Sequence, residues 1–143
     1  FFRMEIEIQK GGNMTEINHV SGLIVDCAYK IHKDLGPGLL ESVYRIIMTE
    51  KLRTTGLLVE PEKPISFEYD GIHISNGFRL DLLVEKLVIV ELKSVEIMSM
   101  VYTKQLLTYL KIMNLSVGLL INFGAPTMKQ GVQRIINGYD NKL

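Results

Sequence analysis

A pair of predicted strands decides the fold class of this chain: residues 78–94 read FRLDLLVEKLVIVELKS. Two runs rich in Leu, Val and Ile flank the charged pair Glu85-Lys86, which is the pattern of a β-hairpin with its tip at that pair. The second run contains Glu91 and Lys93, and residues two apart in a strand project from the same face. An otherwise apolar strand therefore carries a carboxylate and an ammonium group on one side.

These two charges need an explanation, because burying an ion is costly unless the ion is paired or bound to a metal. Three arrangements would remove the cost. The strand could lie at a sheet edge with both charges solvated, the charges could form a structural ion pair, or they could belong to a metal site with a lysine beside it. The strand by itself leaves all three open.

Asp81, on the first strand, determines whether a second carboxylate joins this face. Opposed residues of an antiparallel pair share a face, so Asp81 joins Glu91 and Lys93 only if position 81 pairs with position 91. A two-residue turn at Glu85-Lys86 would pair 81 with 90 and would place the carboxylates on opposite faces. We therefore predict an odd-numbered loop or a bulge at the tip of this hairpin.

The rest of the chain alternates between the three- to four-residue apolar period of helices and the two-residue period of strands. Helices are predicted over residues 15–34, 39–55 and 100–113. Strands are predicted over residues 57–69, 72–75, 78–84, 87–94, 117–123 and 131–136. Sequential strands pair antiparallel, and the strand after the last helix is reached by a crossover, so this order predicts a three-layer α/β domain with a mixed sheet.

The composition fits one globular domain. The 143 residues suffice for one core, and 47% are apolar while 22% are charged. Sixteen basic and sixteen acidic residues leave no global field that would draw the chain onto phosphate, so any nucleic-acid contact must be local. The single Cys27 excludes an internal disulfide and fits a reducing, cytoplasmic location. No apolar run is long enough to cross a membrane.

The first thirteen residues are predicted to be a leader or an added segment. Codons for Lys10-Gly11-Gly12-Asn13 can spell a purine-rich ribosome-binding site, and Met14 follows them directly. We therefore expect a single domain over residues 14–143.

The residues expected on this face of the hairpin indicate a type of reaction. Asp81 and Glu91, together with a backbone carbonyl such as that of Leu92, would form the all-oxygen environment that Mg²⁺ prefers. Lys93 would then help to activate or orient a water for in-line attack on a phosphodiester, or would stabilise the charge that develops on phosphorus. This chemistry is hydrolysis without a covalent intermediate.

The spacing D-x₉-E-x-K across a hairpin resembles the PD-(D/E)XK nuclease superfamily. Residues 38–44, Gly-Leu-Leu-Glu-Ser-Val-Tyr, also resemble the GxxExxY branch of that superfamily. The similarity covers about residues 17–136, and it departs from the pattern at Leu80, which stands where the superfamily name has proline. The resemblance implies a restriction-endonuclease-like fold and a Mg²⁺- or Mn²⁺-dependent nuclease that acts on DNA.

The resemblance also assigns a role to Glu41. A glutamate on this helix approaches the metal in the superfamily, so Glu41 is expected to be a metal ligand beside Asp81 and Glu91. The alternative is that Glu41 only complements the N-terminus of its helix or pairs with Arg45.

Gln105 and Tyr109 are expected to lie on one helix face because they are four residues apart. Their spacing resembles a motif of the nuclease domains of bacterial recombination helicase-nucleases. That resemblance implies that Gln105 contacts Lys93, a base or a phosphate, and that Tyr109 orients it or stacks. The alternative is a solvated glutamine beside a buried tyrosine, and Tyr102 is expected to be a packing residue.

A different class of function stays open: a nucleic-acid-binding or protein-interaction module with the same fold and little or no hydrolysis. The presence of both acids and the lysine favours the enzyme, whereas the zero net charge and the small size favour the binding module. A third hypothesis is that activity requires a homodimer or a protein partner that supplies DNA binding.

Overall fold

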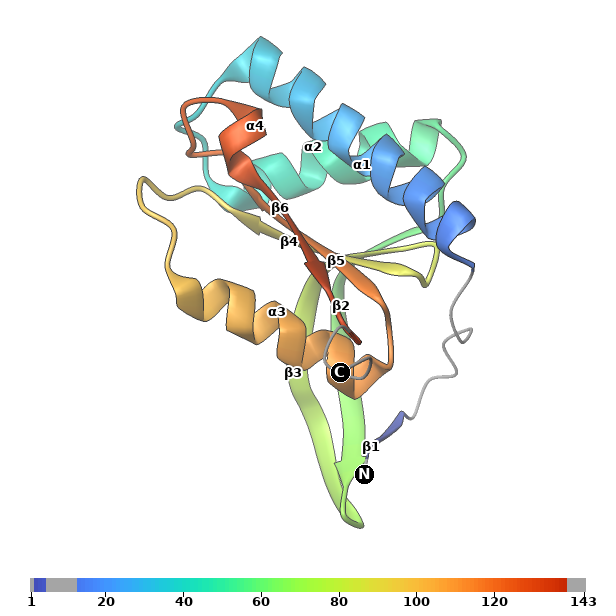
Figure 1. Cartoon of the computed structure of the whole chain (residues 1–143). Helices are drawn as coiled ribbons and strands as arrows, with labels where there is room; N and C mark the ends of the chain where they lie inside the picture. Colours follow the sequence, from blue (N-terminus) through green and yellow to red (C-terminus); the bar gives the residue numbers. More distant parts are fainter. Residues whose placement is uncertain (1, 5–12, 139–143) are drawn as a thin grey trace.

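The computed structural model describes residues 2–4 and 13–138, which form one mixed sheet with helices on both faces (Figure 1). The strands are β1 (Phe2–Met4), β2 (Val59–Tyr69), β3 (Ile72–Val84), β4 (Val88–Lys93), β5 (Val117–Asn122) and β6 (Val132–Ile136). The helices are α1 (Met14–Leu35), α2 (Glu41–Thr54), α3 (Met100–Met113) and α4 (Met128–Gly131). The strand order in the sheet is β1-β2-β3-β4-β5-β6, which confirms the predicted α/β architecture.

The direction of each strand follows from the connection that precedes it. β2 pairs antiparallel with β1 and β3, and β3 pairs antiparallel with β4. β4 and β5 are parallel, and α3 supplies the crossover that a parallel pair requires, as the sequence predicts. β4 therefore lies between β3 and β5 and is not an edge strand.

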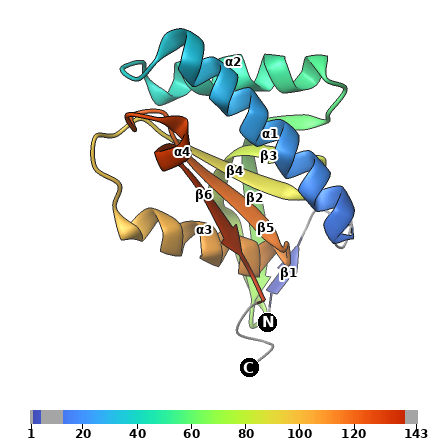
Figure 2. The ribbon, with the colours of Figure 1, turned by 45° about the horizontal axis from the view of Figure 1, so that its top comes forward.

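β4 is buried on both faces, because α1 and α2 lie over one face of the sheet and α3 lies over the other (Figures 1 and 2). Val88, Val90 and Leu92 belong to the apolar core under α1 and α2, whereas Ile89 belongs to the core under α3. The same alternation places Glu91 and Lys93 on the face that α3 covers.

Three details differ from the predicted elements, and the first is β1, an unpredicted strand within the segment expected to be a leader. β3 is a single strand, Ile72–Val84, although residues 72–75 and 78–84 read as separate runs. A register shift between Ile65 and Phe67 of the neighbouring strand accommodates the polar residues between those runs. The short α4 escapes prediction because four residues are too few to show a helical period.

The predicted domain boundary at Met14 coincides with the first residue of α1. The side chain of Asn13 caps this helix by accepting a hydrogen bond from the Glu16 backbone N–H at 2.8 Å. Residue 1 and residues 5–12 of the predicted leader lie outside the described residues, so the leader stays a prediction. None of the helices in the described ranges combines the length and the apolar character that a membrane span requires.

Candidate active site

The β3-β4 hairpin has a three-residue tip, since Val84 pairs with Val88 across residues 85–87. The pairs Leu82–Val90 and Leu83–Ile89 continue this register, and one further step places Asp81 opposite Glu91. The predicted odd-numbered loop is confirmed.

The hairpin tip is held in an unusual backbone conformation. Glu85 and Lys86 both have φ of 54°, a region that non-glycine residues rarely adopt. Glu85 is fixed there by two contacts with Leu58, because its N–H donates to the Leu58 carbonyl at 2.8 Å and its carboxylate accepts from the Leu58 N–H at 2.7 Å. Contacts outside the hairpin thus help to set the register of Asp81 and Glu91.

Asp81 is anchored to β4 through its side chain. Its Oδ2 atom accepts a hydrogen bond from the Leu92 backbone N–H at 2.8 Å. This bond fixes the carboxylate beside Glu91, and it leaves the other oxygen of Asp81 available to a further partner.

Glu91 is an acidic residue that is buried in the sheet. Its exposed fraction is 6%, and its Oε1 atom has no hydrogen-bond partner within the described part of the chain. Burial, with a smaller contribution from the charge of nearby Asp81, raises the pKa of Glu91 to about 9 against the opposing effect of Lys93. A buried carboxylate of this kind is a site at which a cation would bind favourably.

Lys93 does not neutralise Glu91 by a direct contact. Its ammonium nitrogen lies 4.2 Å from the centroid of the Tyr102 ring, a cation–π arrangement. Among the described residues, Lys93 takes part in no salt bridge. In the part of the chain that the structure describes, β4 is thus not an edge strand and Glu91 has no direct ion pair with Lys93, while the metal site stays a prediction.

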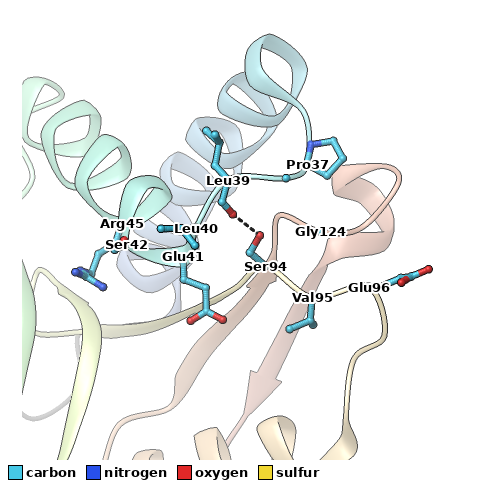
Figure 3. A pocket seen from close by; sticks show the side chains of 11 residues that line it. Pro37, Leu39, Leu40, Glu41, Ser42, Arg45, Ser94, Val95, Glu96 and Gly124 are labelled. Carbon is cyan, nitrogen blue, oxygen red and sulfur yellow. Dashed lines mark hydrogen bonds between the residues drawn. The ribbon is translucent and has the colours of Figure 1, made fainter.

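Glu41 is the first residue of α2, and it lines a cavity of about 740 Å³ between the start of α2 and the loop after β4 (Figure 3). Over the described ranges, no group of three His, Cys, Asp or Glu side chains is placed to hold one metal ion. Glu41 thus does not join Asp81 and Glu91 as a third ligand in this arrangement, and its role stays a prediction. Its predicted alternative partner, Arg45, pairs with Glu62 instead at 3.1 Å.

The two residues of the predicted α3 motif have different surroundings. The ring of Tyr109 stacks on Phe78, with 4.1 Å between the ring centroids, and burial raises its pKa with smaller contributions from the charges of Glu91 and Asp81. Gln105 is exposed and forms no hydrogen bond with Lys93 or another described residue. Tyr109 is therefore near the carboxylates, and the predicted contact of Gln105 with a base or a phosphate stays a prediction.

The loop after Lys93 is fixed by Asn122, a buried residue at the end of β5. The side-chain amide of Asn122 donates to the Val95 carbonyl and accepts from the Val95 N–H, both at 3.0 Å. Its oxygen also accepts from the Gly124 N–H at 2.9 Å, and a Cβ atom at Gly124 would lie only 2.3 Å from the Val95 carbonyl oxygen. The two bonds to Val95 join residues 27 apart, so no local sequence pattern predicts them.

Tyr44 fixes the loop before Glu41 by comparable contacts. It is fully buried, and its ring stacks on Phe123 with 4.2 Å between centroids. Its hydroxyl donates to the Gly36 carbonyl at 2.6 Å and accepts from the Leu39 N–H at 3.3 Å. The tyrosine of the predicted 38–44 motif is therefore a positioning residue for the start of α2.

Replacing Tyr44 with phenylalanine is expected to lower the free energy of unfolding by about 1–3 kcal/mol, since two backbone groups lose a buried partner. The stacked ring should keep the fold intact. Urea denaturation checks the value, with Tyr29→Phe as a control because Tyr29 is 43% exposed. Equal losses in the two variants would contradict the role of the Tyr44 hydroxyl.

Comparison with protein families gives one match. The family model described as the PD-(D/E)XK nuclease superfamily matches residues 18–135, which include all the residues of the predicted site. Searches with the whole chain found no matching curated protein and no matching solved structure.

Proposed function

We propose that this chain, which belongs to the PD-(D/E)XK nuclease superfamily, is a divalent-metal-dependent nuclease that hydrolyses phosphodiester bonds in DNA. The observation that carries the proposal is the Glu91 carboxylate, which is buried on a central strand with an unpartnered oxygen and lies opposite Asp81. The motif at residues 38–44, whose tyrosine holds the loop before Glu41, supports assignment to the GxxExxY branch.

The donor atoms fit a hard divalent cation. Asp81 and Glu91 offer carboxylate oxygens, and the Leu92 carbonyl is a further oxygen on the same strand, a set that suits Mg²⁺ or Mn²⁺. The unpartnered Oε1 atom of Glu91 is the observation that favours this fit. Such an ion would supply Lewis-acid stabilisation of the charge that develops on the phosphoryl group.

The remaining residues are assigned to orientation and charge. Asp81 is preset by its bond to the Leu92 N–H, so little reorganisation is needed for it to act. Lys93, held over the Tyr102 ring, would orient the attacking water or stabilise negative charge on the phosphoryl oxygens. Glu41 is proposed as the third acidic residue, and Gln105 and Tyr109 as contacts for the lysine and the substrate.

Replacing Lys93 with alanine is expected to reduce cleavage by about 100-fold, the usual effect of removing one group that stabilises the transition state. The substrates to compare are single-stranded, duplex and branched DNA and RNA, each with Mg²⁺ or Mn²⁺. Lys111→Ala is the matched control, because Lys111 is exposed in the last turn of α3. Equal cleavage by the wild type and Lys93→Ala would refute the assigned role.

The zero net charge keeps a binding module as the second candidate function. Such a module would retain nucleic-acid binding in the wild type and in Lys93→Ala, and neither protein would cleave any of the substrates with either ion. The same set of assays therefore separates the two functions.

A further inference from the structure

Two arginines converge on one carboxylate oxygen beside the candidate active site. The Arg45 guanidinium lies 3.1 Å from the Oε1 atom of Glu62, and the Arg79 guanidinium lies 3.5 Å from the same atom. Arg45 comes from α2, Arg79 from β3 and Glu62 from β2. Three separate elements thus bring the two positive groups to a single point.

This cluster is adjacent to the proposed metal ligands. The pairs Pro61–Leu82 and Lys63–Leu80 flank Glu62 and Asp81, so these two residues occupy facing positions on neighbouring strands. Arg45 also lines the cavity that contains Glu41, and Figure 3 shows it pointing away from the loop after β4. A phosphate held by the arginines would therefore lie near the reacting group.

Glu62 reaches this position through a strained backbone. Its φ is 50°, in the left-handed region that non-glycine residues rarely adopt. Its side chain is 46% exposed, that of Arg79 is 59% exposed and that of Arg45 is 17% exposed, so the pair with Arg79 adds little to stability. Stability is therefore a poor reason for Arg79 to join the cluster.

The chemistry of the cluster matches a phosphate. Guanidinium groups form paired, charge-assisted hydrogen bonds with phosphate oxygens, and a carboxylate resembles part of that group with less charge. Because the chain has zero net charge, its contacts with nucleic acid must be made by local groups of this kind.

We propose that Arg45 and Arg79 form a clamp for a backbone phosphate of DNA next to the bond that is cut, and that Glu62 occupies this clamp until DNA displaces it. The clamp rests on the proposed function in one respect, since it takes the phosphodiester backbone as the substrate. Glu62 lowers the affinity for DNA by competing for the arginines, and it keeps them oriented while DNA is absent.

The test measures DNA binding without cleavage. Fluorescence anisotropy of a labelled DNA duplex is recorded with Mg²⁺ in the Lys93→Ala background, at a series of salt concentrations. Arg79→Gln and Arg45→Gln are expected to weaken binding several-fold and to reduce the dependence of log affinity on log salt by about 0.9 each, the loss of one phosphate contact. Glu62→Gln is expected to tighten binding several-fold and to steepen that dependence.

Glu50→Gln is the matched control, because Glu50 pairs with Arg53 at 3.4 Å near the other end of α2 and its replacement changes the net charge equally. It should leave the affinity unchanged. In the double variant Glu62→Gln with Arg79→Gln, the gain from Glu62→Gln should be reduced, because one of its two arginines is gone.

The clamp is overturned if Glu62→Gln binds as the control does or more weakly, if Arg79→Gln keeps the full salt dependence, or if no protein binds the duplex. Arg79 is exposed, so Arg79→Gln should fold even if Arg45→Gln does not. If the wild type cleaves DNA, any of the three overturning outcomes contradicts the clamp and not the nuclease proposal. Absence of cleavage together with the expected binding changes would instead overturn the nuclease and keep the clamp.

Discussion

Glu91→Gln is expected to stabilise the metal-free protein at neutral pH and to abolish cleavage. The wild-type side chain is 6% exposed and has an unpartnered oxygen, so the folded state at neutral pH must either bury its charge or take up a proton, and both cost free energy. Glutamine has nearly the same shape and no charge, and it is a poor ligand for a divalent cation. A substitution that raises stability while it removes activity is the signature of a group kept for function.

The stability difference should depend on pH in a defined direction. The pKa of Glu91 is about 9 in the folded state and 4.5 is its ordinary value, so between these values the folded chain holds a proton that the unfolded chain has released. The contribution of Glu91 to stability is complete below its ordinary pKa of 4.5, and it is lost as the pH rises toward the folded-state pKa of about 9. The advantage of glutamine should therefore grow by up to about 1.4 kcal/mol per pH unit across this window.

Urea denaturation in a chelating buffer, at pH values spaced across the window, measures this difference. Glu50→Gln is the control, since Glu50 is exposed on α2. Excess Mn²⁺ should reduce or reverse the advantage of Glu91→Gln by stabilising only the wild type. A stability gap that stays constant or narrows with rising pH would contradict the burial of an ionisable Glu91.

Asp81→Asn is expected to eliminate detectable binding of Mn²⁺ and to lower cleavage by well over 100-fold. Loss of a group that merely orients a metal ligand already costs about 10- to 100-fold, so loss of a ligand should cost more. The fold should persist, because the asparagine oxygen can still accept the hydrogen bond from the Leu92 N–H.

Isothermal titration with Mn²⁺ and the shift in melting temperature on adding Mn²⁺ measure the loss directly. Asp70→Asn is a suitable control, because Asp70 has φ of 50° in the β2-β3 turn and asparagine tolerates that conformation. If Asp81→Asn binds Mn²⁺ as tightly as Asp70→Asn, Asp81 is not a ligand, whatever the effect on cleavage.

The periodic parts of the chain were predictable because their signal is local. Residues 100–113 have a helical period and form α3 over the same range. The register of the β3-β4 hairpin was also predictable, but only by requiring that Asp81 and Glu91 share a face. That requirement came from chemistry, since the loop residues alone favour no particular length.

The remainder of the site depends on contacts between distant segments. Asn122 binds the loop at Val95, and Tyr44 binds the loop at Gly36, and neither contact leaves a periodic trace. The Glu62 side chain meets arginines from two other elements, and no local rule predicts those contacts. The sequence also left three explanations for the charges of β4, and the position of that strand in the sheet removed the edge strand.

The three-residue tip of the β3-β4 hairpin has a consequence for how this protein can change during evolution. Side chains alternate with a period of two, so losing or gaining one residue there would turn Glu91 and Lys93 toward α1 and α2 and would bring Val90 and Leu92 to the other face. Two added residues would leave every side chain on its own face. An odd number of residues at the tip is thus as necessary to the candidate site as the carboxylates themselves.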